Sequence, residues 1–177
     1  DQITDDSVGG KAFGLSRLAA MGLAVPHAFV IRNAESGRYP TDLDPHHRAL
    51  GGGPVAVRSS AEGEDGVGAS FAGQYETVLN VTDREQLRAA IDRCVASMDS
   101  HHASSYRSEQ MNSAQAKMNV VVQRMVDARA AGVAFTADPV TARRDVVIID
   151  AVAGLGESLV SGEETPDHYG VDTAGTI

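Results

Sequence analysis

Apolar residues recur along the chain at two different periods, and these periods predict its helices and strands. Spacings of three and four residues predict a helix over 12–21 and a second helix over about 83–98. Short apolar or alternating segments predict strands at 28–32, 55–58, 77–81, 119–125, 132–136 and 146–151. Unbroken apolar runs at 120–122 and 146–149 further indicate strands that are buried on both faces.

Local signals mark where these helices begin and end. Gly22 ends the first helix, and Gly10 and Lys11 mark its start. The unpaired N–H groups and the positive dipole of a helix N-terminus would favour a phosphate at this point. Thr82 and Glu85 form a capping-box pattern ahead of the second helix.

Two polar segments fit neither period. Residues 33–53 are rich in turn-forming residues, and we interpret them as a connector. Residues 100–117 have a helical pattern only around 103–107. The paired histidines in these segments have no third ligand at a recognisable spacing, so we predict solvent-facing rings and no metal site.

Composition narrows the class of protein. A hydrophobic fraction of 42% and a charged fraction of 22% over 177 residues are typical of a soluble globular protein, with one ordinary core or two small lobes. Because 24 acidic residues face 15 basic ones, the net charge of −9 argues against a nucleic-acid partner. Any anion site must therefore be local, and lysine occurs only at positions 11 and 117.

The cysteine content and the hydropathy of the sequence indicate the cellular compartment in which the protein is expected. The single Cys94 excludes an internal disulfide, and its place in a helical pattern indicates a buried apolar residue rather than a nucleophile. No signal peptide opens the sequence, and no apolar run approaches the roughly 18 residues that span a bilayer. We therefore expect a cytoplasmic protein without a membrane partner.

The candidate chemistry centres on phosphate binding. A predicted strand ends in Arg58, Ser59 and Ser60, directly ahead of a glycine-rich segment at 61–74. Glycines let backbone N–H groups approach anionic oxygens closely, and a guanidinium gives a forked, charge-assisted contact that lysine cannot imitate. This combination of a cation, two hydroxyls and a glycine-rich loop is typical of a polyphosphate site.

Two common phosphate motifs are absent. Asp5 and Ala12 occupy positions where a P-loop requires Gly and then Ser or Thr. In the Gly154-Leu-Gly156 segment, Leu159 replaces the last glycine of the dinucleotide fingerprint. The sequence therefore argues against a P-loop NTPase and against a Rossmann dehydrogenase.

Several further motifs follow one another along most of the chain. They are Val8-Gly-Gly-Lys11, Val55-Ala-Val-Arg-Ser-Ser60, Ser70-Phe-Ala-Gly-Gln-Tyr-Glu-Thr77, Val121-Val-Gln-Arg-Met-Val126, Gly132-Val-Ala-Phe-Thr-Ala-Asp-Pro139, Gly154-Leu-Gly-Glu157 and Thr165-Pro-Asp167. In this order they resemble the N-terminal nucleotide-binding domain of the phosphoenolpyruvate synthase and pyruvate phosphate dikinase family, which includes rifampicin phosphotransferase.

The resemblance implies an α+β fold of the ATP-grasp type, in which two lobes hold ATP between them. We expect residues 1–177 to form one partial domain of this type, with approximate lobes at 1–100 and 101–177. The stretch between residues 31 and 55 is shorter than is usual in the family. The domain is therefore expected to be shortened or truncated.

The resemblance also implies a phosphate site. Lys11 and Arg58 would contact the phosphates of ATP as the catalytic cations, and Gly73 and Thr77 would lie where the loop and the next strand close over the nucleotide. Two cations beside the β- and γ-phosphates would offset the charge that develops as the γ-phosphoryl group leaves.

An adenine site is implied further along the chain. Gln123, with the backbone of Met125 and Val126, would face the base, which a strand edge can read through main-chain groups. Apolar side chains nearby would give the base an adaptable wall. Periodicity alone favours ordinary core packing for Met125 and Val126, and that alternative stays open.

By the same resemblance, the chain would hold ATP for phosphoryl transfer to a histidine on another domain. ATP and Mg²⁺ are the implied cofactors, with the metal ligands expected outside this chain. The implied partners are a histidine-bearing swivel domain and an acceptor-binding domain, because none of the six histidines here occupies a matching motif. We expect part of an ATP-dependent phosphotransferase whose isolated chain is inactive. The alternative is a non-catalytic nucleotide-sensing or scaffold module.

Overall fold

The computed structural model describes residues 6–61, 76–105, 118–172 and 174–176. It divides into two compact units, Asp1–Met125 and Val126–Ile177. The described part of the chain is a mixture of helices and antiparallel strands. None of its helices combines the length and the apolar character that a membrane span requires.

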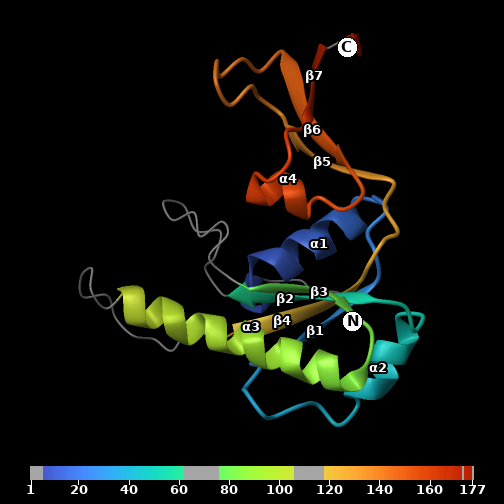
Figure 1. Cartoon of the computed structure of the whole chain (residues 1–177), viewed down its shortest axis with the longest axis vertical. Helices are drawn as coiled ribbons and strands as arrows, with labels where there is room; N and C mark the ends of the chain where they lie inside the picture. Colours follow the sequence, from blue (N-terminus) through green and yellow to red (C-terminus); the bar gives the residue numbers. More distant parts are fainter. Residues whose placement is uncertain (1–5, 62–75, 106–117, 173, 177) are drawn as a thin grey trace. The chain divides into compact units, whose positions relative to one another are not determined.

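A four-stranded antiparallel sheet forms the centre of the first unit (Figure 1). Its strands lie in the order β1-β4-β2-β3 and span Ala28–Ile31, Met118–Arg124, Val55–Ala61 and Thr77–Val81. The side chains of Val120, Val121 and Val122 are fully buried in β4, which confirms the prediction of a strand covered on both faces.

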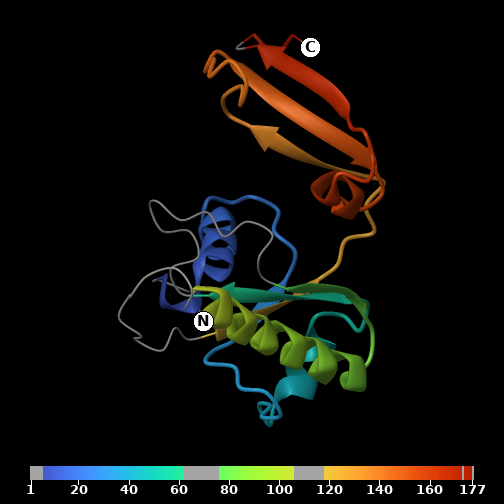
Figure 2. The same ribbon diagram turned by 60° about the vertical axis from the view of Figure 1, so that its left-hand side comes forward.

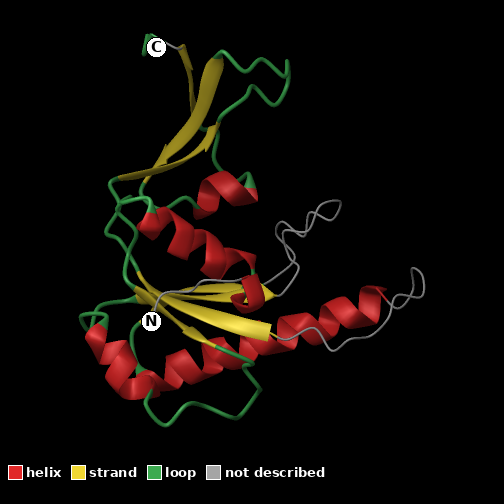
Figure 3. Cartoon of the chain, turned by 180° about the vertical axis from the view of Figure 1, so that it is seen from behind, coloured by secondary structure: helices red, strands yellow, loops and turns green. Residues whose placement is uncertain are grey.

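Helices cover both faces of this sheet (Figure 3). On one face lie the 3₁₀ turn η1 (Asp6–Val8) and helix α1 (Gly10–Ala20), and on the other lie α2 (Leu43–Ala49) and α3 (Arg84–Ser105). The predicted apolar stripe of α3 is confirmed among its described side chains, because Leu87, Ile91 and Cys94 are buried in the main core. Helix α1 packs over a smaller cluster that contains Val121.

The start of α3 differs from the predicted capping box by one residue. The Oδ1 atom of Asp83 accepts a hydrogen bond from the Gln86 N–H at 2.8 Å, and Gln86 Oε1 accepts one from the Thr82 N–H at 3.0 Å. Asp83 and Gln86 therefore cap the helix in place of Thr82 and Glu85. Both pairs have the required spacing, and Asp is as good an N-cap as Thr, so the pattern alone did not separate them.

The segment 33–53 is not a bare connector, because it contains α2. Leu43 and Leu50 at the two ends of this helix are buried in the main core. Pro45 concealed the helix in the sequence, although a proline in the first helical turn removes no hydrogen bond. The prediction of solvent-facing histidines is also wrong for His47, which is half-buried with its Nε2 atom enclosed.

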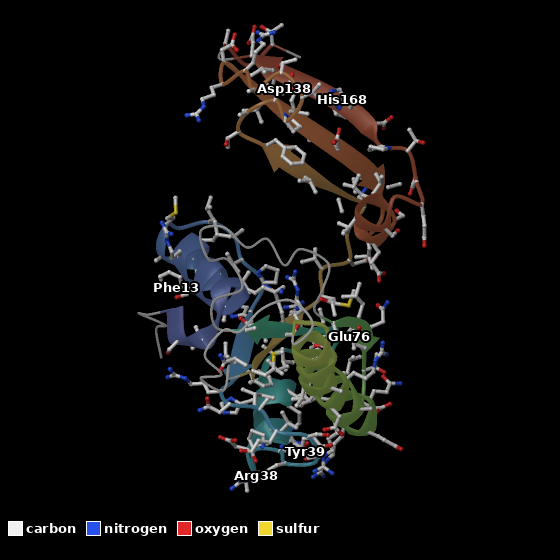
Figure 4. All side chains as sticks on the ribbon, turned by 90° about the vertical axis from the view of Figure 1, so that its left-hand side faces the viewer. Phe13, Arg38, Tyr39, Glu76, Asp138 and His168 are labelled. Carbon is white, nitrogen blue, oxygen red and sulfur yellow. The ribbon has the colours of Figure 1, made fainter. Side chains whose placement is uncertain are left out.

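Asp92 of α3 fastens the start of this segment. Its carboxylate accepts hydrogen bonds from the Tyr39 hydroxyl at 2.6 Å, the Gly37 N–H at 2.9 Å and the Ser36 hydroxyl at 3.2 Å. Arg88 lies over the Tyr39 ring, with its guanidinium carbon 4.9 Å from the ring centroid. Figure 4 shows Tyr39 and Arg38 beside one another in this part of the first unit.

The second unit is a three-stranded antiparallel sheet in the order β5-β6-β7 (Figure 2). Its strands span Ala130–Phe135, Val146–Ala153 and Asp167–Asp172, and the short helix α4 spans Glu157–Ser161. The expectation that residues 146–149 are buried on both faces is wrong. Ile148 is 7% exposed, whereas Val147 is 37% exposed because it points to the opposite face.

The boundary between the compact units lies at Met125, whereas the expected lobes meet near residue 100. Strand β4 belongs to the first unit because it pairs with both β1 and β2. Gly73, part of the expected phosphate site, lies outside the described residues.

Candidate functional site

The strand register brings three of the expected site residues to one face of the first sheet. Arg58 of β2 pairs with Thr77 of β3, and Ala56 of β2 pairs with Gln123 of β4. Residues directly opposite one another share a face, as do residues two apart in a strand. Arg58, Thr77 and Gln123 therefore lie on the same face, although they come from separate strands.

Helix α1 packs on that same face, which places Lys11 there. Arg58 pairs with Val121, and Val121 packs against Val8 and Ala12 on either side of Lys11. Ser60, two residues after Arg58, contacts the same turn of α1. The structure thus brings the chain segments of Lys11 and Arg58 to one side of the sheet, and their joint role in binding phosphates stays a prediction.

The contact between α1 and β2 requires a glycine at position 9. Gly9 has a φ of 84°, and a Cβ atom on it would lie only 2.4 Å from the Ser60 carbonyl oxygen. Both the positive φ and the lack of space exclude other residues without a shift of the backbone. Gly9 therefore lets the N-terminus of α1 approach the end of β2.

The guanidinium of Arg58 has a buried donor without a partner within the described residues. Its side chain is half-buried, and its buried Nε atom has no hydrogen-bond partner there. A buried donor without a partner is costly, because its desolvation is not compensated. The Nε atom of Arg88 on α3 is buried without a partner in the same way, so this feature does not by itself identify an anion site.

Gln123 is 8% exposed and uses its amide nitrogen to hold the chain ahead of β1. Its Nε2 atom donates to the Pro26 carbonyl at 3.3 Å. The backbone N–H of Arg124 donates to the His27 carbonyl at 2.9 Å. These bonds fix the C-terminal end of β4, a central strand of the sheet, where adenine is expected.

Met125 and Val126 differ in their surroundings. The Met125 N–H donates to the Pro54 carbonyl at 3.0 Å, and the Met125 sulfur accepts a hydrogen bond from the Asn80 N–H at 3.1 Å. A main-chain hydrogen bond from Met125 to a base would therefore have to use its carbonyl oxygen. Val126 is 57% exposed, so it is not packed in a core.

The two buried serines of β2 serve opposite faces, which sequence reasoning missed. The Ser59 hydroxyl donates to the Glu76 carbonyl at 3.0 Å, whereas the Ser60 hydroxyl donates to the Val8 carbonyl at 2.9 Å. The Ser60 oxygen also accepts a hydrogen bond from the Ala12 N–H at 3.2 Å. Alternation along a strand was the available signal, because it sends only Ser60 to the face of Arg58.

The thiol of Cys94 is buried beneath the sheet, as the sequence predicts. Its sulfur lies 3.7 Å from the carbonyl oxygens of Val57 and Glu76. Burial, with the nearby Glu76 carboxylate, raises the pKa of the Cys94 thiol to about 12. It remains protonated near neutral pH and is not a nucleophile.

The family resemblance implies a Mg²⁺ ion, and its ligands are not identified among the described residues. Nowhere in the described ranges do three His, Cys, Asp or Glu side chains gather as a metal-binding group. The Nε2 atom of His46 lies 3.2 Å from Asp42 Oδ2, and the Nδ1 atom of His168 lies 2.6 Å from Asp150 Oδ1. Each is a pair of two side chains rather than a group of three.

Comparison with known proteins identifies the family. The family described as pyruvate phosphate dikinase, AMP/ATP-binding domain, matches residues 42–176. The chain is 37% identical to the prodigiosin synthesizing transferase PigC of Serratia marcescens, over 94% of this chain and 22% of that protein.

Two further relatives match shorter parts of the chain. A rifampicin phosphotransferase from a Streptomyces species is 51% identical over 63% of this chain and 13% of its own length. The phosphoenolpyruvate synthase of Pyrococcus furiosus is 46% identical over 67% of this chain and 15% of its own length. The chain thus spans about a fifth or less of the relatives it matches, and it belongs to the family of pyruvate phosphate dikinase AMP/ATP-binding domains.

Proposed function

We propose that this chain is the ATP-binding module of a phosphotransferase similar to phosphoenolpyruvate synthase and pyruvate phosphate dikinase. The observation that carries the proposal is the common face of Arg58, Thr77 and Gln123, to which α1 also brings Lys11. Family membership supports ATP as the ligand. In this proposal the two compact units correspond to parts of an ATP-grasp-like domain.

The two cations take separate roles at the triphosphate. Arg58 extends from a strand held on both sides by β3 and β4, so its fork is presented from a rigid support. Lys11 extends from the first turn of α1, where the helix dipole adds to its positive charge. Together they bind the phosphates and offset the charge that develops during phosphoryl transfer.

The remaining expected residues complete the proposal. In this proposal Gly73 and Thr77 lie where the loop and the next strand close over the nucleotide, and Gln123, Met125 and Val126 line the adenine site. The γ-phosphoryl group passes to a histidine on a swivel domain elsewhere in the polypeptide or on a partner protein. Mg²⁺ ligands come from outside the described residues. The comparisons do not favour the alternative of a non-catalytic sensor or scaffold.

Calorimetric titration with ATP tests the proposal. Lys11→Ala removes one cation, and Arg58→Lys keeps the charge but loses the fork, so each is expected to weaken ATP binding by about tenfold. Arg38→Lys is the matched control, because the Arg38 side chain is 80% exposed and pairs with Glu35. The two residues form an isolated bridge outside the strands that carry Arg58 and Gln123. Equal ATP affinity in the wild type, Lys11→Ala and Arg58→Lys would refute the assignment.

A further inference from the structure

We propose that Ser60 is a positioning residue that sets Lys11 relative to Arg58. This inference rests on the proposed function, because it concerns the two cations assigned to the triphosphate. Arg58 and Ser60 lie two residues apart on β2 and share its α1 face. Ser60 is fully buried and does not itself face solvent, so it acts through Lys11 rather than on the ligand.

The geometry at Ser60 links the strand to both sides of the turn that carries Lys11. Its hydroxyl donates to the carbonyl of Val8 at 2.9 Å and accepts from the N–H of Ala12 at 3.2 Å. Ala12 directly follows Lys11 in the chain. The one hydroxyl therefore fixes the backbone before and after the lysine against the strand that bears Arg58.

Other contacts keep α1 docked when this hydroxyl is removed. The Asn119 amide donates to the Ser7 carbonyl at 3.1 Å and accepts from the Asn33 N–H at 3.1 Å. Val8 and Ala12 also remain packed against Val121. Loss of the Ser60 hydroxyl is therefore expected to loosen the first turn of α1 without releasing the helix from the sheet.

Ser59 provides a matched control in the neighbouring position. It is as fully buried as Ser60, and its hydroxyl also donates to one backbone carbonyl, that of Glu76. The backbone N–H of Ser59 donates to the same carbonyl at 3.2 Å, so this attachment survives Ser59→Ala. Ser59→Ala thus removes a buried hydroxyl from the same strand without touching α1.

The experiment is a double-mutant cycle measured by calorimetry with ATP and with AMP. Ser60→Ala is expected to weaken ATP binding by about tenfold and AMP binding by less than about twofold, since only the polyphosphate needs both cations. Ser59→Ala is expected to change neither affinity. In the Lys11→Ala background, Ser60→Ala should cause no further loss, because positioning acts only through the lysine.

The outcomes separate this inference from the proposed function. If the wild type and Lys11→Ala bind ATP equally, the assignment of Lys11 fails and the inference fails with it. If Lys11→Ala weakens binding but Ser60→Ala behaves like Ser59→Ala, or adds fully to Lys11→Ala, only the role of Ser60 is overturned. Should Ser60→Ala not fold, Ser60→Cys enters the same cycle, because the thiol keeps a weak donor at nearly the same size.

Discussion

Arg58 and Thr77 lie directly opposite one another in the antiparallel pair of β2 and β3. Their side chains therefore emerge on one face of the sheet as nearest cross-strand neighbours. Thr77 is exposed at the start of β3, three residues after the end of the glycine-rich segment 61–74. A hydroxyl in this position is available to a ligand that also contacts the guanidinium.

Thr77→Val tests that relationship while keeping the shape of the side chain. Valine retains the β-branch that suits a strand, so the thermal midpoint should change by little. Loss of one hydrogen bond to the nucleotide should weaken ATP binding by about threefold to tenfold, as measured by calorimetry. Thr41→Val in an exposed turn is the control, and an unchanged ATP affinity in Thr77→Val would remove Thr77 from the site.

The cap of α3 gives a prediction about stability. Asp83→Ala removes the acceptor for the Gln86 N–H and should destabilise the first unit by about 1 kcal/mol in urea denaturation. Glu85→Ala should change stability by only a few tenths of a kcal/mol, because Glu85 makes no capping bond among the described residues. A larger loss of stability in Glu85→Ala than in Asp83→Ala would instead support the predicted capping box of Thr82 and Glu85.

Cys94 gives a prediction about reactivity and pH. Its thiol should resist alkylation at pH 8 in the native chain and react readily in urea, because burial keeps it protonated. The folded pKa of about 12 lies above the ordinary value of 9.0, so the folded state retains this proton more strongly. This contribution to stability is complete below pH 9.0 and is lost as the pH rises towards 12.

Cys94→Ser is the control for both measurements, because it removes the only thiol of the chain. Its native stability should show a smaller decline over the same alkaline interval. Rapid alkylation of the folded wild type at pH 8 would contradict the buried position of the sulfur.

Periodicity was sufficient for the elements whose burial repeats along the chain. Helix α3 and strand β4 are examples, because each faces a continuous core. Helix α2 was not predicted, because Pro45 and neighbouring polar residues break the helical pattern between Leu43 and Leu50, the two buried leucines at its ends. Strand β7 was not predicted, since Asp167–Asp172 is polar, contains Gly170 and is mostly exposed.

The residues of the candidate site differ in the same respect. Some can be selected from their local sequence, and others depend on contacts between segments that are distant in sequence. Arg58 and Lys11 could be selected from their local sequence and from the family resemblance. The role of Ser60 could not, because its partners Val8 and Ala12 lie 52 and 48 residues away in sequence. Bonds of that kind depend on how helix and sheet pack, and no periodic pattern encodes them.

The last prediction is that the 177-residue chain binds ATP without turning it over. Lys11 and Arg58 can hold a triphosphate, but alignment of the reacting groups supplies roughly 7–11 kcal/mol of a barrier, and this requires an acceptor site. The described residues offer neither an acceptor histidine in a matching motif nor a group of metal ligands. Release of AMP, ADP and phosphate from ATP with Mg²⁺ should therefore stay at background for the purified chain. Turnover that is abolished by Lys11→Ala would instead show that this chain supplies its own metal ligands.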